Sequence, residues 1–144
     1  LTSKVRHEAL YDELSQIAPT VMSESAGAGW KDNIRLTAEA VGREDQADQV
    51  IADYEARAAE IGAAVNEAAG DPTVSVVRMM DPIRLYQQGS FSGVVLDDAG
   101  IARPDNQQAL DPFIKEISAE QFQEANADVI FYTVPPAAAE LAEQ

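Results

Sequence analysis

The middle of the chain shows the hydrophobic spacing of two consecutive amphipathic helices. Between residues 30 and 41, apolar side chains recur every three or four positions, and Gly42 follows as a helix stop. A second run with the same spacing starts near Glu44 and continues until a Gly-Asp-Pro sequence at residues 70–72. The pattern therefore predicts two long helices in series.

The second half of the chain alternates short extended runs with short helical ones. Three extended runs favour strands: TVSVV, IRLY and DVIFYTV, at residues 73–77, 83–86 and 128–134. Ser90 and Ser118 are suited to cap helices, and a last helix is expected after Pro136. Residues 101–117 contain two prolines and are expected to form a loop. Strands that alternate with helices in this way predict an α/β fold.

The first segment of the chain predicts one further helix and a boundary. The helix is expected over residues 4–18, because Pro19 stops it. Its apolar positions are Leu10, Leu14 and Ile17. The sequence SESAGAG at residues 23–29 is typical of a flexible connection and marks the clearest boundary in the chain.

Composition limits the chemistry that these 144 residues can carry out. Hydrophobic residues make up 46% of the chain, enough for a core of ordinary size. The absence of Cys and the single His7 exclude disulfides, thiolate metal sites and a Ser-His triad within this chain. The formal net charge of −15 opposes binding to nucleic acid and to anionic lipid. No apolar run approaches the ~20 residues that a membrane-spanning helix needs.

Carboxylates are numerous, but none carries a signature of acid–base catalysis. Neighbouring acids such as Asp97 and Asp98 are interpreted as solvated helix faces and caps. An acid–base pair needs one carboxyl group whose pKa is raised by burial, and no feature of the sequence indicates one. A phosphate-binding glycine loop is also missing, because AGAGW at residues 26–30 lacks the preceding strand and the required spacing.

Two arginines and a tyrosine stand out because they lie where strands give way to loops. Arg78 follows a strand of buried type, and Arg84 and Tyr86 lie in the next extended run. Ligands of open α/β sheets collect at the carboxyl ends of strands, and a guanidinium group binds oxyanions through paired hydrogen bonds. The alternative is a structural ion pair, for which the chain offers Asp81, Asp97 and Asp98. The residues alone leave both interpretations open.

Two aromatic residues at helix starts are equally ambiguous. Trp30 and Phe91 either anchor the hydrophobic core or form a wall of a pocket. Tyr86, with a polar tip on an aromatic ring, either lines a cleft or caps a core. The residue types alone do not decide between these roles.

Five stretches, in this order and spacing, resemble one protein family. They are YDELSQIAPTV, WKDNIRLTAEAVGRED, QADQVIADYEARAAEIGAAV, VSVVRMMDPIRLYQQGSFSGVVLDDAGIARPDNQ and ISAEQFQEANADVIFYTV. Together they cover nearly the whole chain, and it resembles the iron-siderophore class of periplasmic binding proteins, the substrate-binding components of ABC importers. The resemblance implies a three-layer α/β lobe preceded by long connector helices, which form a helical backbone between two lobes.

The resemblance also implies a domain organisation. Residues 1–22 correspond to the end of an N-terminal lobe, and residues 23–43 to a linker and the connector helix between the lobes. Residues 44–144 correspond to a C-terminal ligand-binding lobe. Family members are considerably longer, so we expect this chain to be part of a longer protein, truncated at the end of that lobe.

In this family the ligand is an Fe(III)-siderophore held between the lobes, which implies no enzyme activity, no cofactor and no protein ligand to the metal. The positions that match ligand contacts are Arg78, Arg84, Tyr86, Trp30 and Phe91. Glu120, in the helix start Ser118-Ala119-Glu120, matches a glutamate that docks to the ABC transporter permease. Its alternative role is that of an acid that stabilises the helix start. The implied location is extracytoplasmic, with a lipid anchor on an N-terminus outside this chain.

Three alternatives remain open at this point. The first is a haem or cobalamin binding protein of the same fold, in which Tyr86 would serve as a haem ligand. The second is an α/β enzyme whose catalytic residues lie outside this chain, and the third is an interaction domain without a small-molecule ligand. We also expect Trp30 to be unusually exposed or covered by another copy of the chain.

Overall fold

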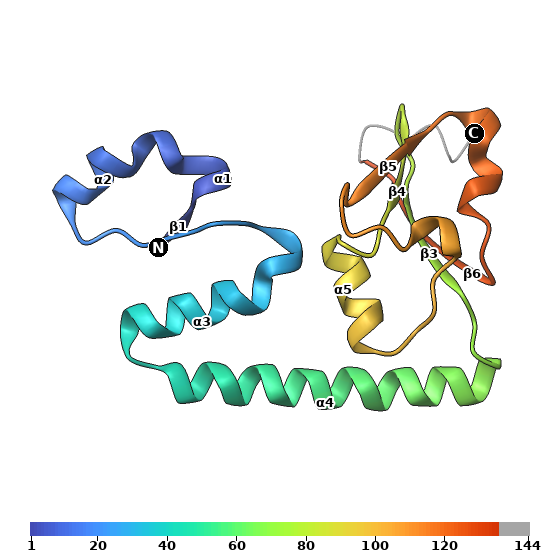
Figure 1. The fold of residues 1–144 in the computed structure, drawn as a ribbon, viewed down its shortest axis with the longest axis horizontal. Helices are drawn as coiled ribbons and strands as arrows, with labels where there is room; N and C mark the ends of the chain where they lie inside the picture. The colour runs from blue at the N-terminus through green and yellow to red at the C-terminus, as the bar shows by residue number, and fades with distance from the viewer. Residues whose placement is uncertain (136–144) are drawn as a thin grey trace. The chain divides into compact units, whose positions relative to one another are not determined.

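The structure is a computed structural model that describes residues 1–135. The chain forms two compact units, Leu1–Ala56 and Arg57–Gln144. The predicted last helix after Pro136 lies outside the described residues. The longest element is α4 (Glu44–Ala69), which is one unbroken helix and contributes residues to both units (Figure 1). The predicted lobe boundaries stay a prediction.

The first unit begins with short elements rather than with the single helix that was expected. Residues 4–18 form α1 (Lys4–His7), the 3₁₀ turn η1 (Glu8–Leu10) and α2 (Tyr11–Ile17). Two short parallel strands, β1 (Thr2–Ser3) and β2 (Met22–Ser23), flank these helices. Leu10 and Ile17 remain exposed. Without a packed apolar face, helical segments of this length are marginal, which accounts for the breaks.

The two helices predicted in series are confirmed. After the 3₁₀ turn η2 (Gly27–Gly29), α3 spans Trp30–Val41, and Gly42 ends it in the left-handed conformation with φ 64°. The first turn of α4 carries Glu44 and Asp45, where the positive end of the helix dipole stabilises acidic side chains. Local features of the sequence therefore predicted where α3 and α4 begin and end.

The second unit is built on a mixed four-stranded sheet. Its strands are β3 (Val74–Arg78), β4 (Ile83–Tyr86), β5 (Ile114–Ile117) and β6 (Val129–Thr133), and their order is β5-β4-β3-β6. β3 pairs with β6 in parallel, whereas β4 is antiparallel to both β3 and β5. Three of these strands were predicted, as the extended runs at residues 73–77, 83–86 and 128–134.

The expectation of a loop throughout residues 101–117 was wrong, because β5 lies at its end. The sequence IKEI does not alternate, because its two charged residues are adjacent, and it therefore lacks the periodic signal of a half-buried strand. Pairing with β4 makes this segment a strand. Its charged residues are held by ion pairs, Glu116 with Arg84 and Lys115 with Glu124.

The hydrophobic core of the second unit lies on one face of this sheet. Val77, Leu85 and Ile117 come from three adjacent strands and pack with Ala125. All four are at most 2% exposed. Ala125 ends η4 (Ala119–Ala125), a 3₁₀ helix where an α-helix was expected. The start of η4 was predicted correctly: Ser118 forms a capping box with Gln121.

The remaining helix of the unit, α5 (Phe91–Asp98), has the cap that the sequence indicated. The Ser90 hydroxyl accepts a hydrogen bond from the Gly93 amide at 3.0 Å. α5 approaches α4 closely, since a Cβ at Gly62 would lie 1.6 Å from the carbonyl oxygen of Ala99. In addition, the Asn66 amide donates to the Gly100 carbonyl at 2.9 Å. These contacts fix α5 against the C-terminal part of α4.

A carboxylate clamp joins the starts of β3 and β6. Asp128 Oδ2 accepts hydrogen bonds from the Thr73 amide at 2.8 Å and from the Thr73 hydroxyl at 2.7 Å, and Thr73 Oγ1 accepts one from the Asp128 amide at 3.1 Å. The Thr73 hydrogen bonds hold the pKa of Asp128 below its usual value. The clamp sets the start of the parallel register between the two strands.

The clamp predicts a pH dependence of stability. The pKa of Asp128 is lower in the folded state than in the unfolded state, so its ionised carboxylate stabilises the fold at pH values above the unfolded-state pKa. This stabilisation is lost as the pH falls through the folded-state pKa. We expect Asp128→Asn to reduce the free energy of unfolding at pH 7, and this difference from the wild type to shrink below about pH 4. Urea unfolding at pH 7 and pH 3 measures both values. Glu67→Gln, at an exposed acid on α4, is the control, and equal behaviour of the two variants would contradict the clamp.

Candidate ligand-binding site

The structure brings Arg78, Arg84 and Tyr86 together on one face of the sheet. Arg78 ends β3 and lies directly opposite Arg84 in the antiparallel register with β4. Opposite residues project from the same face, and so do residues two apart along a strand, which adds Tyr86. The buried Val77 and Leu85 occupy the other face. The three predicted residues therefore share one surface.

The charges of the two arginines are only partly neutralised. Arg84 Nε donates to Glu116 Oε1 at 3.1 Å, across the pair of β4 with β5, and its side chain is 33% exposed. Arg78 is half-buried, and its side chain makes no hydrogen bond or ion pair with any of residues 1–135 that the structure describes. Its expected alternative partners, the aspartates at residues 81, 97 and 98, do not pair with it there. Like charges that lie directly opposite each other destabilise a sheet. Because Glu116 pairs only with Arg84, the positive charge of Arg78 has no partner among the described residues.

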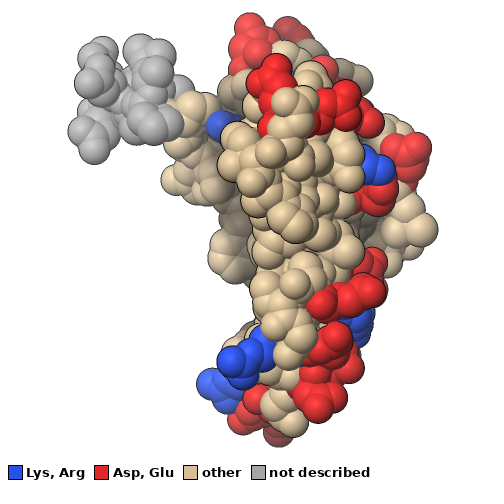
Figure 2. Space-filling view, turned by 90° about the vertical axis from the view of Figure 1, so that its left-hand side faces the viewer, with Lys and Arg blue, Asp and Glu red and all other residues tan. Residues whose placement is uncertain are grey.

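This positive charge lies in a strongly acidic chain. The formal net charge is −15, and in Figure 2 acidic side chains line the top and the right-hand margin of the visible face, whereas its middle carries mostly uncharged residues. A guanidinium group with free N–H donors beside a second one is suited to bind a planar oxyanion through paired hydrogen bonds. The arrangement thus favours an anionic ligand over a cationic one.

A buried polar network supports the strand end that carries Tyr86. The Arg103 guanidinium donates through Nη2 to the carbonyl of Tyr86 and, at 3.2 Å, to Gln107 Oε1. Gln107 is fully buried, accepts a hydrogen bond from Ser75 at 3.0 Å and donates to the Glu124 carbonyl at 3.2 Å. The network ties β3, β4 and η4 to the 3₁₀ turn η3 (Asp105–Gln107).

Arg103 and Gln107 are residues that the sequence analysis missed. Both lie in the segment interpreted as a loop, where polar residues are usually solvated. Yet Arg103 is only 8% exposed, and burial lowers the pKa of its guanidinium group below its usual value. No periodic signal marks a buried arginine in a loop, so only the tertiary structure reveals it.

The two aromatic candidates have different surroundings. Trp30 is half-buried, and its ring meets that of Tyr54 edge-on, with 4.8 Å between the centroids and an interplanar angle of 88°. The Lys31 ammonium lies 5.8 Å from the centroid of Trp30. Trp30 is therefore not unusually exposed, because Tyr54 of the same chain packs against it, and the expectation that another copy covers it stays a prediction. Phe91 is 54% exposed at the start of α5, and its role stays a prediction.

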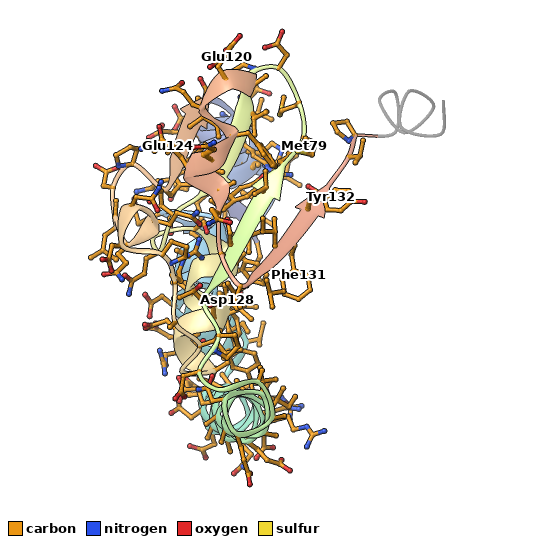
Figure 3. The ribbon with its side chains drawn as sticks, turned by 90° about the vertical axis from the view of Figure 1, so that its right-hand side faces the viewer. Met79, Glu120, Glu124, Asp128, Phe131 and Tyr132 are labelled. Atoms are coloured by element: carbon orange, nitrogen blue, oxygen red, sulfur yellow. The ribbon has the colours of Figure 1, made fainter. Side chains whose placement is uncertain are left out.

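Glu120 lies in the first turn of η4, as expected. The Ser118 side chain and the backbone amide of Glu120 hydrogen-bond its carboxylate, and they hold its pKa below the usual value. The side chain is exposed and lies at the opposite end of η4 from Asp128 (Figure 3). It borders a groove that includes Phe122 and Ile130. An exposed, ionised glutamate beside apolar residues is suited to a protein contact, and this role stays a prediction.

Within residues 1–135 the structure contains no cluster of three or more His, Cys, Asp or Glu side chains that would hold a metal ion. In the same range, no helix is both long and apolar enough to cross a membrane.

Comparison with known proteins identifies the family. A family model described as "Periplasmic binding protein" matches residues 1–143. The chain belongs to the periplasmic binding protein family. The resemblance that the sequence indicated is thereby confirmed.

Two relatives of this family member show what similar proteins bind. One is a "Probable siderophore-binding lipoprotein YfiY" of Bacillus subtilis, 40% identical over 90% of this chain and 42% of the relative. The other is SirA of Staphylococcus aureus, whose crystal structure has 29% identity and a TM-score of 0.81 over 99% of this chain and 56% of SirA. A second SirA structure, complexed with staphyloferrin B, matches with 32% identity and a TM-score of 0.76 over 92% of this chain and 48% of that one.

These relatives confirm two expectations. The SirA structure has the same mixed helix-and-sheet fold. The family match and the relative described as siderophore-binding show that this family member is a binding protein rather than an enzyme. The chain spans about half the length of the relatives that it matches. The ligand and partners of this family member are therefore inferred below.

The buried network predicts a stability effect at Gln107. Replacing Gln107 by Leu leaves the Ser75 hydroxyl without its acceptor and removes one acceptor from the buried Arg103 guanidinium group, whereas the Glu124 carbonyl keeps the hydrogen bond from Asn106. We expect a loss of about 1–3 kcal/mol in the free energy of unfolding. Urea unfolding monitored by circular dichroism measures it. Gln123→Leu, at an exposed glutamine of η4, is the matched control and is expected to change stability by less than about 0.5 kcal/mol. Equal effects of the two variants would contradict a structural role for the network.

Proposed function

We propose that this family member captures a ferric siderophore and delivers it to an ABC importer. The observation that carries the proposal is the pair Arg78–Arg84 on one sheet face, which only one carboxylate of the described residues, Glu116, neutralises. The relatives support the iron complex as the ligand, because one is described as siderophore-binding and another was crystallised with staphyloferrin B.

The chemistry of the site fits an anionic iron complex. The siderophore itself surrounds the iron, so the protein supplies hydrogen-bond donors to the ligand's oxygen atoms instead of metal ligands. Arg78 provides the unpaired guanidinium group, while Arg84 has to share its donors with Glu116. Binding of the anion removes the repulsion between the two arginines, which adds to the affinity.

Aromatic side chains complete the proposed site. Tyr86 lies on the same sheet face as the arginines, and Arg103 fixes the backbone there through the Tyr86 carbonyl. Phe91, at the start of α5 in the same unit, is a further wall, because aromatic rings cover large ligand surfaces at low entropic cost. Trp30 belongs to the other unit, and its contact with the ligand stays a prediction. The ligand would lie in a cleft between two lobes, of which this chain supplies the C-terminal one.

Delivery requires a contact with the permease, and Glu120 is our candidate for it. It is exposed, its pKa is lowered, and it is therefore ionised at neutral pH to pair with a basic residue. The proposed location is extracytoplasmic, with attachment to the membrane through a lipid anchor. A relative described as a lipoprotein supports this location.

The ligand proposal predicts a specific effect of Arg78. We expect Arg78→Ala to weaken binding of Fe(III)–staphyloferrin B at least tenfold, or ~1.4 kcal/mol, because the unpaired guanidinium group is removed. Isothermal titration calorimetry of the 144-residue chain at fixed ionic strength measures the affinity, and haem is titrated in parallel.

Arg57→Ala is the matched control for that experiment. Arg57 on α4 is exposed and paired with Glu60, so this variant changes the net charge equally without touching the sheet face. We expect its affinity to stay within twofold of the wild type. Equal weakening in both variants would reduce the effect of Arg78 to general electrostatics, and saturable binding of haem alone would overturn the siderophore proposal.

The docking proposal predicts that a substitution at Glu120 affects permease binding but not siderophore binding. We expect Glu120→Ala to lower the affinity of the chain for its permease in nanodiscs at least tenfold, since an ion pair is lost, and to leave siderophore affinity unchanged. Biolayer interferometry measures the first and calorimetry the second. Glu67→Ala, at an exposed acid of α4, serves as the control. Permease binding that ignores Glu120 would contradict the docking role.

A further inference from the structure

The two arginines of the sheet face belong to a row of side chains that crosses β6, β3, β4 and β5. Arg78 lies beside Thr133 of the parallel strand β6 and opposite Arg84 of the antiparallel strand β4, and Arg84 in turn lies opposite Glu116 of β5. Partners in register project from the same face of a sheet. One hydroxyl, two guanidinium groups and one carboxylate therefore follow one another across the strands, and Glu116 is the acid of this row.

The contact between Glu116 and Arg84 uses only one edge of the guanidinium group. Glu116 Oε1 accepts a hydrogen bond from Arg84 Nε at 3.1 Å. Because Nε lies on the side of the group, this bond leaves the fork of the two terminal nitrogen atoms unused. Such a fork binds a planar oxyanion through two parallel hydrogen bonds. Glu116 thus holds Arg84 without occupying the end that would meet an anionic ligand.

The charges of the row leave one positive charge unbalanced. The two arginines contribute one charge each, Glu116 cancels one of them, and Thr133 is neutral. Lys115 does not alter this balance, because its register partner Leu85 faces the core on the other side and its ammonium group pairs with Glu124. A ligand of low negative charge matches this row, whereas each further negative charge on a ligand is repelled by the carboxylate of Glu116.

We propose that Glu116 is a specificity-determining residue, which sets the charge class of the ferric siderophore. By cancelling one arginine, it favours complexes of low negative charge over the triply negative complexes that Fe(III) forms with three catecholates. A repulsive element of this kind discriminates between ligands that share the same attractive contacts. The inference rests on the proposed function, because it concerns the same sheet face.

An ion pair with a purely structural role would behave differently. A contact that only holds β4 against β5 affects stability, and it affects the affinity for every ligand alike. A residue that sets the charge preference affects each ligand according to its charge. Glu116→Gln separates the two roles, because the amide oxygen can still accept the hydrogen bond from Arg84 Nε while the negative charge is lost.

Calorimetric titration of the 144-residue chain with two ferric complexes tests the proposal. The probes are Fe(III)–staphyloferrin B and Fe(III)–enterobactin, a more highly charged tris-catecholate. We expect Glu116→Gln to raise the affinity for Fe(III)–enterobactin about tenfold and that for Fe(III)–staphyloferrin B only about threefold, since the repulsion that is removed grows with the ligand's charge. The gain should shrink as the salt concentration rises, because ions screen the repulsion.

Glu60→Gln is the matched control for Glu116→Gln. Glu60 pairs with Arg57 on α4 at 2.7 Å, so the variant makes the same charge change at an ion pair away from the sheet face. We expect both of its affinities to stay within about twofold of the wild type. The pair of Glu116 with Arg84 is partly exposed, and such pairs contribute little to stability. Both variants should therefore keep the wild-type melting temperature, which circular dichroism checks.

The outcomes separate this inference from the proposed function. Suppose that the wild type binds Fe(III)–staphyloferrin B, while Glu116→Gln gains equally for both complexes or gains nothing for Fe(III)–enterobactin. The charge preference is then wrong, and the proposed function stands. Gains in Glu60→Gln equal to those in Glu116→Gln would also overturn the inference, because general electrostatics would explain them. A wild type that binds neither complex would contradict the proposed function and this inference with it.

Discussion

The antiparallel register of β3 and β4 is the constraint on which the proposed site depends. It sets Arg78 opposite Arg84, and it is fixed by the buried pair Val77 and Leu85 on the other face. A shift of the β3–β4 register by one residue would exchange the two faces of a strand and bury an arginine. The packing of the core therefore keeps the two like charges opposite each other. Glu116 on β5 offsets one of them. The stability of the core thus maintains two like charges in an electrostatically unfavourable arrangement.

The polar network around Gln107 gives this arrangement a rigid support. It joins the strand end at Tyr86, through Arg103, to the carbonyl of Glu124 in η4. η4 also carries Glu120 in its first turn. The proposed ligand face and the proposed docking residue therefore belong to one hydrogen-bonded framework. Such a framework preorganises the site, because few side chains need to be ordered when a ligand arrives.

Local signals in the sequence predicted the parts of the fold that depend on neighbouring residues. Gly42 and the periodic apolar positions placed α3 and α4, and Ser90 placed the start of α5. The sequence analysis missed β5, because IKEI becomes a strand only through pairing with β4. It therefore also missed Glu116 of β5 as the partner of Arg84. The three residues of the sheet face could be predicted because strand ends are recognisable, whereas the buried role of Arg103 depends on contacts far apart in the sequence.

The most direct test of the account observes the arginine side chains themselves. In a chain labelled with ¹⁵N-arginine, NMR resolves the Nε–Hε signals during titration with the Ga(III) complex of staphyloferrin B, a diamagnetic substitute for the ferric one. The account predicts saturable shifts of the Arg78 and Arg84 signals at the same ligand concentration, with the Arg57 signal unmoved. Shifts that are equal at all arginines, or that do not saturate, would contradict an anion-binding site on this face of the sheet.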